Sequence, residues 1–179
     1  MIYDITQEVF SGRVYPGDPQ PQFTRVKDYA MGAQSRVTQL TMQVHAGTHI
    51  DAPVHRVQGG KGIDRIPLEK CIGACEVIDF AHREKLQNSE SKRVLFKNCE
   101  EIDEETALLL VEKQVVFVAA EGPSIGNRAV HRILLENEVA VLEGAVLSGV
   151  PEGVYTLYAP PVLLGDCDGA PCRAVLIRE

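Results

Sequence analysis

Three histidines and an aspartate lie within one run of eleven residues, HAGTHIDAPVH, which extends from His45 to His55. His49 and Asp51 follow His45 at offsets of four and six residues. Neutral imidazole and carboxylate oxygen are ligands that zinc, manganese and similar divalent ions accept, and a catalytic site leaves a coordination position open for water. His45, His49 and Asp51 therefore supply a metal-ligand set, and we interpret the chain first as a metal-dependent enzyme.

The last residue of this run, His55, has two roles open to it. It is either a fourth metal ligand or the acid and base that moves a proton during catalysis. An imidazole with an ordinary pKa of about 6.5 suits the second role near neutral pH. Residue type and spacing alone do not separate the two roles.

The segment before the run has the pattern of a half-buried strand. Between Ser35 and His45 apolar and polar side chains alternate, which predicts a strand with His45 on its polar face. Gly47 and Pro53 disfavour a helix in the residues that follow. We therefore expect the other candidate ligands at a strand end and in the irregular loop after it.

The remaining pattern predicts a mixed α/β domain. Runs rich in Val, Ile and Leu predict further strands at 76–80, 93–96, 115–120, 139–142, 154–159 and 173–177. Two helices are expected, Glu104–Lys113 after a cap at Asp103 and Arg128–Glu136 after a cap at Asn127. No linker, repeat or low-complexity segment interrupts the pattern, so a single domain over residues 1–179 is predicted.

Composition excludes several classes of partner. Eighteen basic and 25 acidic residues leave a net charge of −7 without a basic cluster, which argues against nucleic acid. The apolar runs are far shorter than the ~20 residues of a membrane span, so no membrane partner is expected. Asp4, Gln7 and Glu8 interrupt any apolar core of a signal peptide. Five cysteines without a CxxC pair fit a reducing cytoplasm better than a disulfide framework or a thiolate metal site.

The run HAGTHIDAPVH resembles the HxGTHxDxPxH signature of the cyclase family, whose best-known members are the bacterial kynurenine formamidases. Three further blocks, VYPGDP, HRILLENEVAVLEG and CDGAPCRAVLI, resemble other family blocks in the same order. The similarity thus extends over nearly the whole chain. It implies the swivelling β/β/α architecture of this family, a mixed sheet packed with a few helices, and a homo-oligomer.

The resemblance also implies roles for individual residues. It implies five ligands for two divalent ions, Zn²⁺ or Mn²⁺, and these are His45, His49, Asp51, His131 and Glu143. The first three would hold one ion and His131 the second, with Glu143 contacting both and Asp51 bridging. His55 would be the proton donor and acceptor. Such a pair of ions would generate hydroxide from water and stabilise the oxyanion formed during amide hydrolysis.

The chain departs from the formamidase pattern at two places. Tyr15 of VYPGDP stands where formamidases of the family usually carry a tryptophan that stacks on the aromatic substrate. A tyrosine can still stack with less area, and the alternative is a turn residue before Pro16 and Gly17. Glu121 stands where the family more often has an aspartate.

Three more polar residues are predicted to have structural or surface roles. Asp166 and Asp168 flank Cys167 in a glycine-rich loop. For both we favour turn formation over a hydrogen bond to a ligand histidine. His82 is predicted to lie on the surface.

The leading hypothesis is a cytoplasmic metal-dependent hydrolase that cleaves the amide C–N bond of a small aryl formamide. N-formylkynurenine is the first candidate substrate, which would make the chain an arylformamidase of tryptophan catabolism. Tyr15 and Glu121 motivate an alternative, in which the same binuclear site opens a cyclic amide such as isatin or carries out a cyclisation. A non-catalytic alternative is a protein that binds a ligand through its metal or holds zinc structurally. His55 argues against it, because structural zinc is normally closed by four protein ligands.

Overall fold

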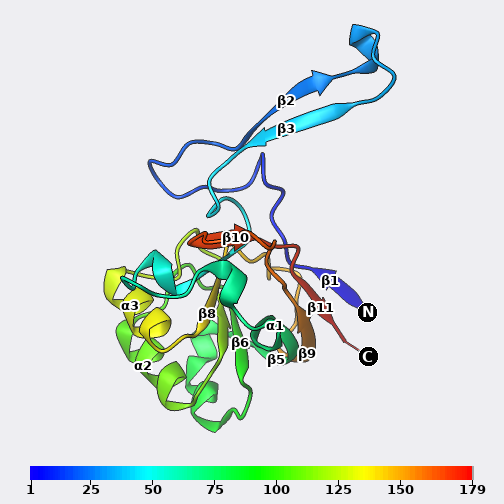
Figure 1. Cartoon of the computed structure of the whole chain (residues 1–179). Coiled ribbons are helices and arrows are strands. Elements are labelled where there is room, and N and C mark those ends of the chain that lie inside the picture. Colours follow the sequence, from blue (N-terminus) through cyan, green and yellow to red (C-terminus); the bar gives the residue numbers. More distant parts are fainter. Residues whose placement is uncertain (179) are drawn as a thin grey trace.

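In residues 1–178, which the computed structural model describes, nine strands form one mixed sheet (Figure 1). Four strands run parallel at its centre, in the order β5 (Ile72–Asp79), β6 (Arg93–Lys97), β7 (Phe117–Ala119) and β8 (Ala140–Glu143). Antiparallel strands extend the sheet beyond β5 through β9 (Gly153–Tyr158), β11 (Val175–Ile177) and β1 (Ile2–Asp4). Beyond β8 lie β4 (His49–Asp51) and β10 (Gly169–Pro171). The mixed α/β prediction is confirmed, and the strand order places β4 between two segments that follow it much later in the chain.

Two helices provide two of the three crossovers that the four parallel strands require. Helix α2 (Glu104–Glu112) connects β6 to β7, and α3 (Arg128–Glu136) connects β7 to β8. The side chain of Asp103 accepts a hydrogen bond from the backbone N–H of Thr106, and Asn127 caps α3 in the same way. Both helices and both caps are therefore confirmed, and α2 and α3 lie together on one side of the sheet (Figure 1).

The sheet separates two apolar layers. Alternate residues of one strand enter different layers, so Leu95 packs with Phe117 and Leu142 on one face, while Phe96 packs with Leu110 on the helix-covered face. Strands that are buried on both faces form continuous apolar runs in the sequence. This explains the runs that coincide with β6, β7 and β8. The other three runs coincide with β5, β9 and β11, which also carry partly exposed residues, and the ends of the observed strands are shifted from the predicted ones.

Short helical turns occupy several connections. They are α1 (Leu68–Cys71), η1 (Tyr29–Met31), η2 (Pro53–His55), η3 (Ile63–Arg65) and η4 (Phe80–Asn88). The η2 turn follows β4 after a single residue and ends at His55, so the expected strand end followed by irregular structure is confirmed. Within residues 1–178, no helix has the length and apolar character needed to cross a membrane.

A separate hairpin projects from the body of the molecule (Figure 1). It consists of β2 (Gln22–Lys27) and β3 (Val37–Thr41), which pair only with each other. The predicted strand over 35–45 is wrong in two respects, because β3 is exposed along its whole length and ends before His45. Alternation of apolar and polar residues identifies a strand, but it does not show whether another element covers the apolar face. Among the described residues, no second sheet or helix layer covers this hairpin. His45 lies instead in the turn between β3 and β4.

Candidate metal centre

Pairing of β4 with β8 brings together residues that are far apart in the sequence. His49 is the register partner of Glu143, so the two side chains occupy neighbouring positions on one face of the sheet. Asp51, two residues along β4, points to the same face because strand side chains alternate. Helix α3 packs against β8 and contributes His131.

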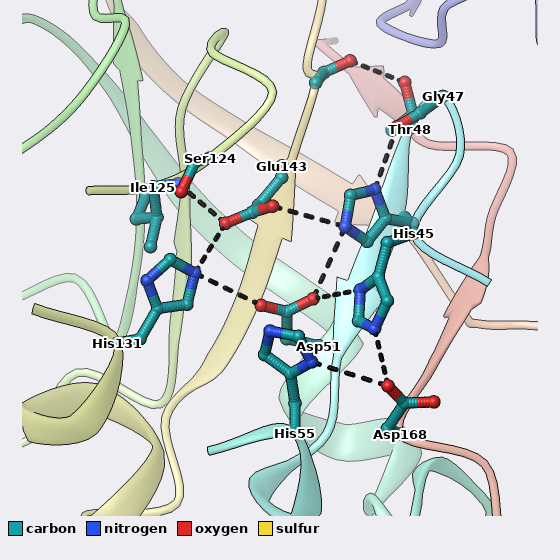
Figure 2. Close-up of polar contacts among 12 residues, drawn as sticks. His45, Gly47, Thr48, Asp51, His55, Ser124, Ile125, His131, Glu143 and Asp168 are labelled. Carbon is teal, nitrogen blue, oxygen red and sulfur yellow. Dashed lines mark hydrogen bonds and ion pairs between the residues drawn. The ribbon is translucent and has the colours of Figure 1, made fainter. Parts of the chain in front are cut away.

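The five predicted ligands converge in the structure (Figure 2). They are His45, His49, Asp51, His131 and Glu143. The Oδ1 atom of Asp51 lies 2.9 Å from Nδ1 of His45 and 3.4 Å from Nε2 of His49, while Oδ2 lies 3.5 Å from Nε2 of His131. One carboxylate is thus shared among three imidazoles.

Glu143 is the second shared carboxylate. Its Oε1 atom lies 2.9 Å from Nε2 of His131, and its Oε2 atom lies 3.3 Å from Nε2 of His49. The backbone N–H of Ile125 donates to Oε1 at 2.6 Å, which holds the carboxylate in place. Both carboxylates therefore connect the histidine of helix α3 with those of the β4 region.

Four of the five residues are almost completely removed from solvent, and the His45 side chain is 18% exposed. The exposed fractions are 1% for His49, 0% for Asp51, 3% for His131 and 4% for Glu143. Burial opposes the charged form of His49, but hydrogen bonds with Asp51 and Glu143 outweigh it and raise the pKa of His49 to about 10. The same balance raises the pKa of His131 to about 10. The carboxylates thus stabilise positive charge at this position.

Two atoms of the cluster lack hydrogen-bond partners. Nε2 of His49 and Oδ2 of Asp51 are buried without a hydrogen bond among residues 1–178, although each faces oppositely charged atoms at 3.3–3.5 Å. Buried polar atoms normally form hydrogen bonds, and leaving two of them without a partner lowers the stability of the folded state. A divalent cation would satisfy both, because it accepts the lone pairs of nitrogen and oxygen together. The donor set therefore fits a divalent metal.

In His49 and His131, the ring nitrogen that does not face the shared carboxylates, the outer nitrogen, lies near a backbone carbonyl oxygen. Nδ1 of His49 lies 2.9 Å from the carbonyl oxygen of Gly47, and Nδ1 of His131 lies 3.1 Å from that of Asn127. Such contacts fix the proton on the outer nitrogen and leave the inner lone pair for a metal. The backbone of the turn and of helix α3 therefore orients two of the imidazoles.

The carboxylate of Asp168 orients the imidazole of His45 in the same way. This differs from the turn-forming role that the sequence predicts for Asp168. Its Oδ2 atom lies 2.9 Å from Nε2 of His45 and 3.5 Å from Nδ1 of His55. Asp166 has positive φ and forms the turn, as predicted, whereas Asp168 directs its carboxylate into the site. Gly169, which follows Asp168, is the feature of the sequence that could indicate this role. A Cβ atom at Gly169 would lie 2.8 Å from Cε1 of His45, so the Asp-Gly pair admits the imidazole as well as making a bend.

His55 contacts the cluster from the η2 turn. One of its ring nitrogens lies within 4.8 Å of ligand atoms of Asp51 and His131 (Figure 2). Burial lowers the pKa of His55 below its ordinary value, and the charges of His45 and Arg56 add to this shift while the Asp51 carboxylate opposes it. The surroundings therefore favour the neutral form of His55, which is the form that can accept a proton.

A cavity of about 260 Å³ opens onto the cluster. Tyr15 lines it together with His45, His55, His131 and Glu143, so the predicted substrate-contacting residue borders the predicted ligands. Glu121 does not line this cavity, and its carboxylate accepts hydrogen bonds from the backbone of Asn98 and Leu147. The Glu121 departure thus has a structural role. His82 is exposed, as expected, and lies 3.4 Å from Glu152.

Comparisons with known proteins show the family of this chain. A family model described as "Putative cyclase" matches residues 3–111, more than half of the chain. The chain is 31% identical over 202 residues to a kynurenine formamidase from Erythrobacter litoralis, covering 98% of this chain and 93% of the relative. The chain therefore belongs to the cyclase family.

Solved structures show the same fold. One is described as a potential metal-dependent hydrolase with cyclase activity. It is 30% identical, with a TM-score of 0.86, and the match covers 100% of this chain and 98% of that one. Isatin hydrolase A from Labrenzia aggregata, at 19% identity, has a TM-score of 0.84 over 98% of this chain and 93% of its own. The second likeness concerns the fold alone.

Proposed function

We propose that this protein is a metal-dependent hydrolase that cleaves the amide C–N bond of a small aryl formamide, with N-formylkynurenine as the first candidate. The observation that carries the proposal is the convergence of five nitrogen and oxygen donors beside His55 at one cavity. The relative from Erythrobacter litoralis, similar over almost its whole length, is a kynurenine formamidase and supports the substrate class.

We further propose that the cluster holds two ions, Zn²⁺ or Mn²⁺. His45, His49 and Asp51 would hold one and His131 the other, with Asp51 and Glu143 shared. The support is that each carboxylate contacts both His131 and His49. A divalent ion in such a site lowers the pKa of water and stabilises negative charge that develops on a carbonyl oxygen.

The protein side chains supply orientation and proton transfer. Asp168 faces Nδ1 of His55, which leaves Nε2 as the proton-accepting atom. His55 takes a proton from the attacking water and delivers it to the leaving arylamine nitrogen, so that formate and a free amine result. Tyr15, half exposed at the cavity, would pack against the aryl ring.

The decisive experiment is turnover of N-formylkynurenine by metal-stripped protein that has been reconstituted separately with zinc and manganese. We expect metal-dependent turnover that is lost in His55→Ala while metal content is retained. A fully loaded wild-type protein that cleaves no formamide would overturn the proposal. Loss of metal and of folding together in His55→Ala would instead favour a structural site.

The second candidate function is opening of a cyclic amide such as isatin at the same site. Tyr15 favours it, because it offers less stacking area than tryptophan at the cavity. Parallel assays with isatin and N-formylkynurenine separate the two activities. A kcat/KM for isatin well above that for the formamide would make the cyclic amide the principal substrate class.

We also propose a cytoplasmic homo-oligomer. The five cysteines are free, and four of them are buried, as a reducing compartment allows. The hairpin exposes large apolar side chains on an isolated pair of strands, and such a pair is at best marginally stable without a covering layer. A second copy of the chain would provide that layer.

A further inference from the structure

The cavity at the metal cluster is lined by two charged side chains to which the proposed hydrolysis assigns no contact with the substrate. Arg56 and Asp18 both line it, beside Tyr15 and His55. Among residues 1–178, neither side chain takes part in any of the ion pairs or side-chain hydrogen bonds of the structure. A cation and an anion at one small cavity are therefore both available to a ligand.

Arg56 is held close to the reacting groups by the backbone. It ends the η2 turn, where its N–H donates to the carbonyl oxygen of Pro53, and it follows His55 directly. It also lines an adjoining hollow with Arg128 and Arg132, of which Arg132 is paired with Glu136. Arg56 is the residue shared by the cavity and this hollow, and its guanidinium can attract an anionic group of a ligand.

Asp18 is positioned by the turn that also presents Tyr15. The N–H of Asp18 donates to the carbonyl oxygen of Tyr15 at 3.0 Å, and Gly17 has φ of 99°, which favours glycine. The turn therefore places an aromatic ring and a carboxylate at the same cavity. An aryl substrate that stacks on Tyr15 would bring its substituents near Asp18.

We infer that Arg56 and Asp18 form a subsite for a zwitterionic α-amino acid group carried by the substrate, with Arg56 binding the carboxylate and Asp18 the ammonium. A guanidinium offers two parallel donors that match a carboxylate, and the Asp18 carboxylate accepts from an ammonium. The inference rests on the proposed function, because the same cavity must hold the scissile amide. A neutral ring such as isatin presents neither charge, so this subsite selects the open-chain amino acid.

Paired substrates test this assignment. N-formylkynurenine carries the amino acid group, and formanilide has the same aryl formamide without it. We expect Arg56→Gln and Asp18→Asn each to raise KM for N-formylkynurenine by about tenfold to a hundredfold, the range for a lost charged hydrogen bond. KM for formanilide should change less than about twofold. Arg56→Lys should restore part of the loss, because it keeps the charge but not the fork of donors.

Arg65→Gln is the matched control, since Arg65 is an exposed arginine of the η3 turn that does not line the cavity. Circular dichroism and thermal melting establish that all variants fold. Equal changes for both substrates, or no change for either, in the Arg56 and Asp18 variants would overturn the inference while leaving the proposed hydrolysis intact.

Binding is measured independently of turnover by calorimetric titration of kynurenine into metal-loaded protein. We expect binding to wild type and Arg65→Gln, and at least tenfold weaker binding to Arg56→Gln and Asp18→Asn. If wild type hydrolyses neither formamide, the proposed function fails, and this titration still decides the inference. Undiminished binding of kynurenine to both charge variants would refute the subsite.

Discussion

Asp168 and His45 form a hydrogen-bonded pair at the edge of the metal-ligand cluster, with Oδ2 of Asp168 2.9 Å from Nε2 of His45 (Figure 2). The opposite nitrogen of the ring, Nδ1, lies 2.9 Å from Oδ1 of Asp51. Asp168 thereby places the imidazole proton on Nε2 and leaves the Nδ1 lone pair for a metal. The pair makes the loop before β10 part of the site.

We predict that Asp168→Asn weakens metal binding by about tenfold to a hundredfold, the usual effect of losing the partner of a ligand histidine. The fold should be retained, because half of the Asp168 side chain is exposed. Competition against a chelator measures the affinity. An unchanged affinity would mean that the backbone alone orients His45.

Gly169 should tolerate no side chain. A Cβ atom there would lie 2.8 Å from Cε1 of His45 and 3.0 Å from the carbonyl oxygen of Ile50, so Gly169→Ala must shift the imidazole or separate β10 from β4. We expect a loss of metal affinity and a decrease of about 1–3 kcal/mol in the free energy of unfolding, measured with urea. Gly165→Ala is the control, since a Cβ atom at Gly165 would meet no other atom within 4 Å. Equal behaviour of the two variants would contradict this explanation.

Metal removal should lower thermal stability. A ligand that binds only the folded state stabilises it by about 2.7 kcal/mol at a hundredfold excess over Kd, so wild-type Tm should rise with added zinc or manganese. In Asp51→Asn this rise should disappear, because Asp51 contacts three of the predicted ligand histidines. His82→Ala, a change at an exposed histidine outside the cluster, should keep it. A metal-dependent rise in Asp51→Asn would show that the ion binds elsewhere.

Glu152 provides a pH-dependent contribution to stability. Hydrogen bonds from the backbone N–H of Asp79 and from Lys85 lower the pKa of Glu152 from 4.5 to about 2. Because the folded pKa is lower than the ordinary value, this contribution is complete above about pH 4.5 and is lost as the pH falls towards 2. Urea midpoints of wild type and Glu152→Gln should therefore differ at pH 7, and the difference should shrink as the pH falls from about 4.5 towards 2.

The control for this prediction is Glu90→Gln, at an exposed glutamate of the surface segment before β6. Its urea midpoint should follow that of wild type at every pH. A difference between wild type and Glu152→Gln that persists unchanged at pH 3 would show that ionisation of Glu152 is not its source.

The hairpin should mediate self-association. Leu40 on β3 is 55% exposed, and Met31 in the η1 turn between the two hairpin strands is 68% exposed. Light scattering should give a mass above the 19.6 kDa of one chain. The double variant Leu40→Glu with Met31→Glu should shift towards the monomer, because a buried charge disfavours the interface. Leu163→Glu, at an apolar residue exposed outside the hairpin, is the control. A monomeric wild type would refute the prediction.

Local sequence signals were sufficient for several elements. Asp103 and Asn127 cap helices whose hydrogen bonds are made within a few residues, so their positions could be predicted from the chain itself. His49, Asp51 and His55 lie so close together in sequence that any strand end or turn keeps them near one another. Their chemistry was therefore apparent before the fold.

Other members of the site could not be derived from local pattern. Only the family resemblance predicts ligand roles for His131 on α3 and Glu143 on β8, because their meeting depends on a helix packing against a strand that pairs with β4. For the same reason the local pattern predicts only a turn at Asp168, since the pairing of β10 with β4 brings it to His45.

Neighbouring residues and side-chain chemistry are thus enough to predict the ligand types, the capped helices and the buried strands. Only the folded chain shows the strand order, the exposure of the hairpin, the placement of His45 in a turn and the orientation of its ring. Those features depend on contacts between distant segments. Each is selected by burial of apolar faces and satisfaction of polar groups across the whole chain, which no local window contains.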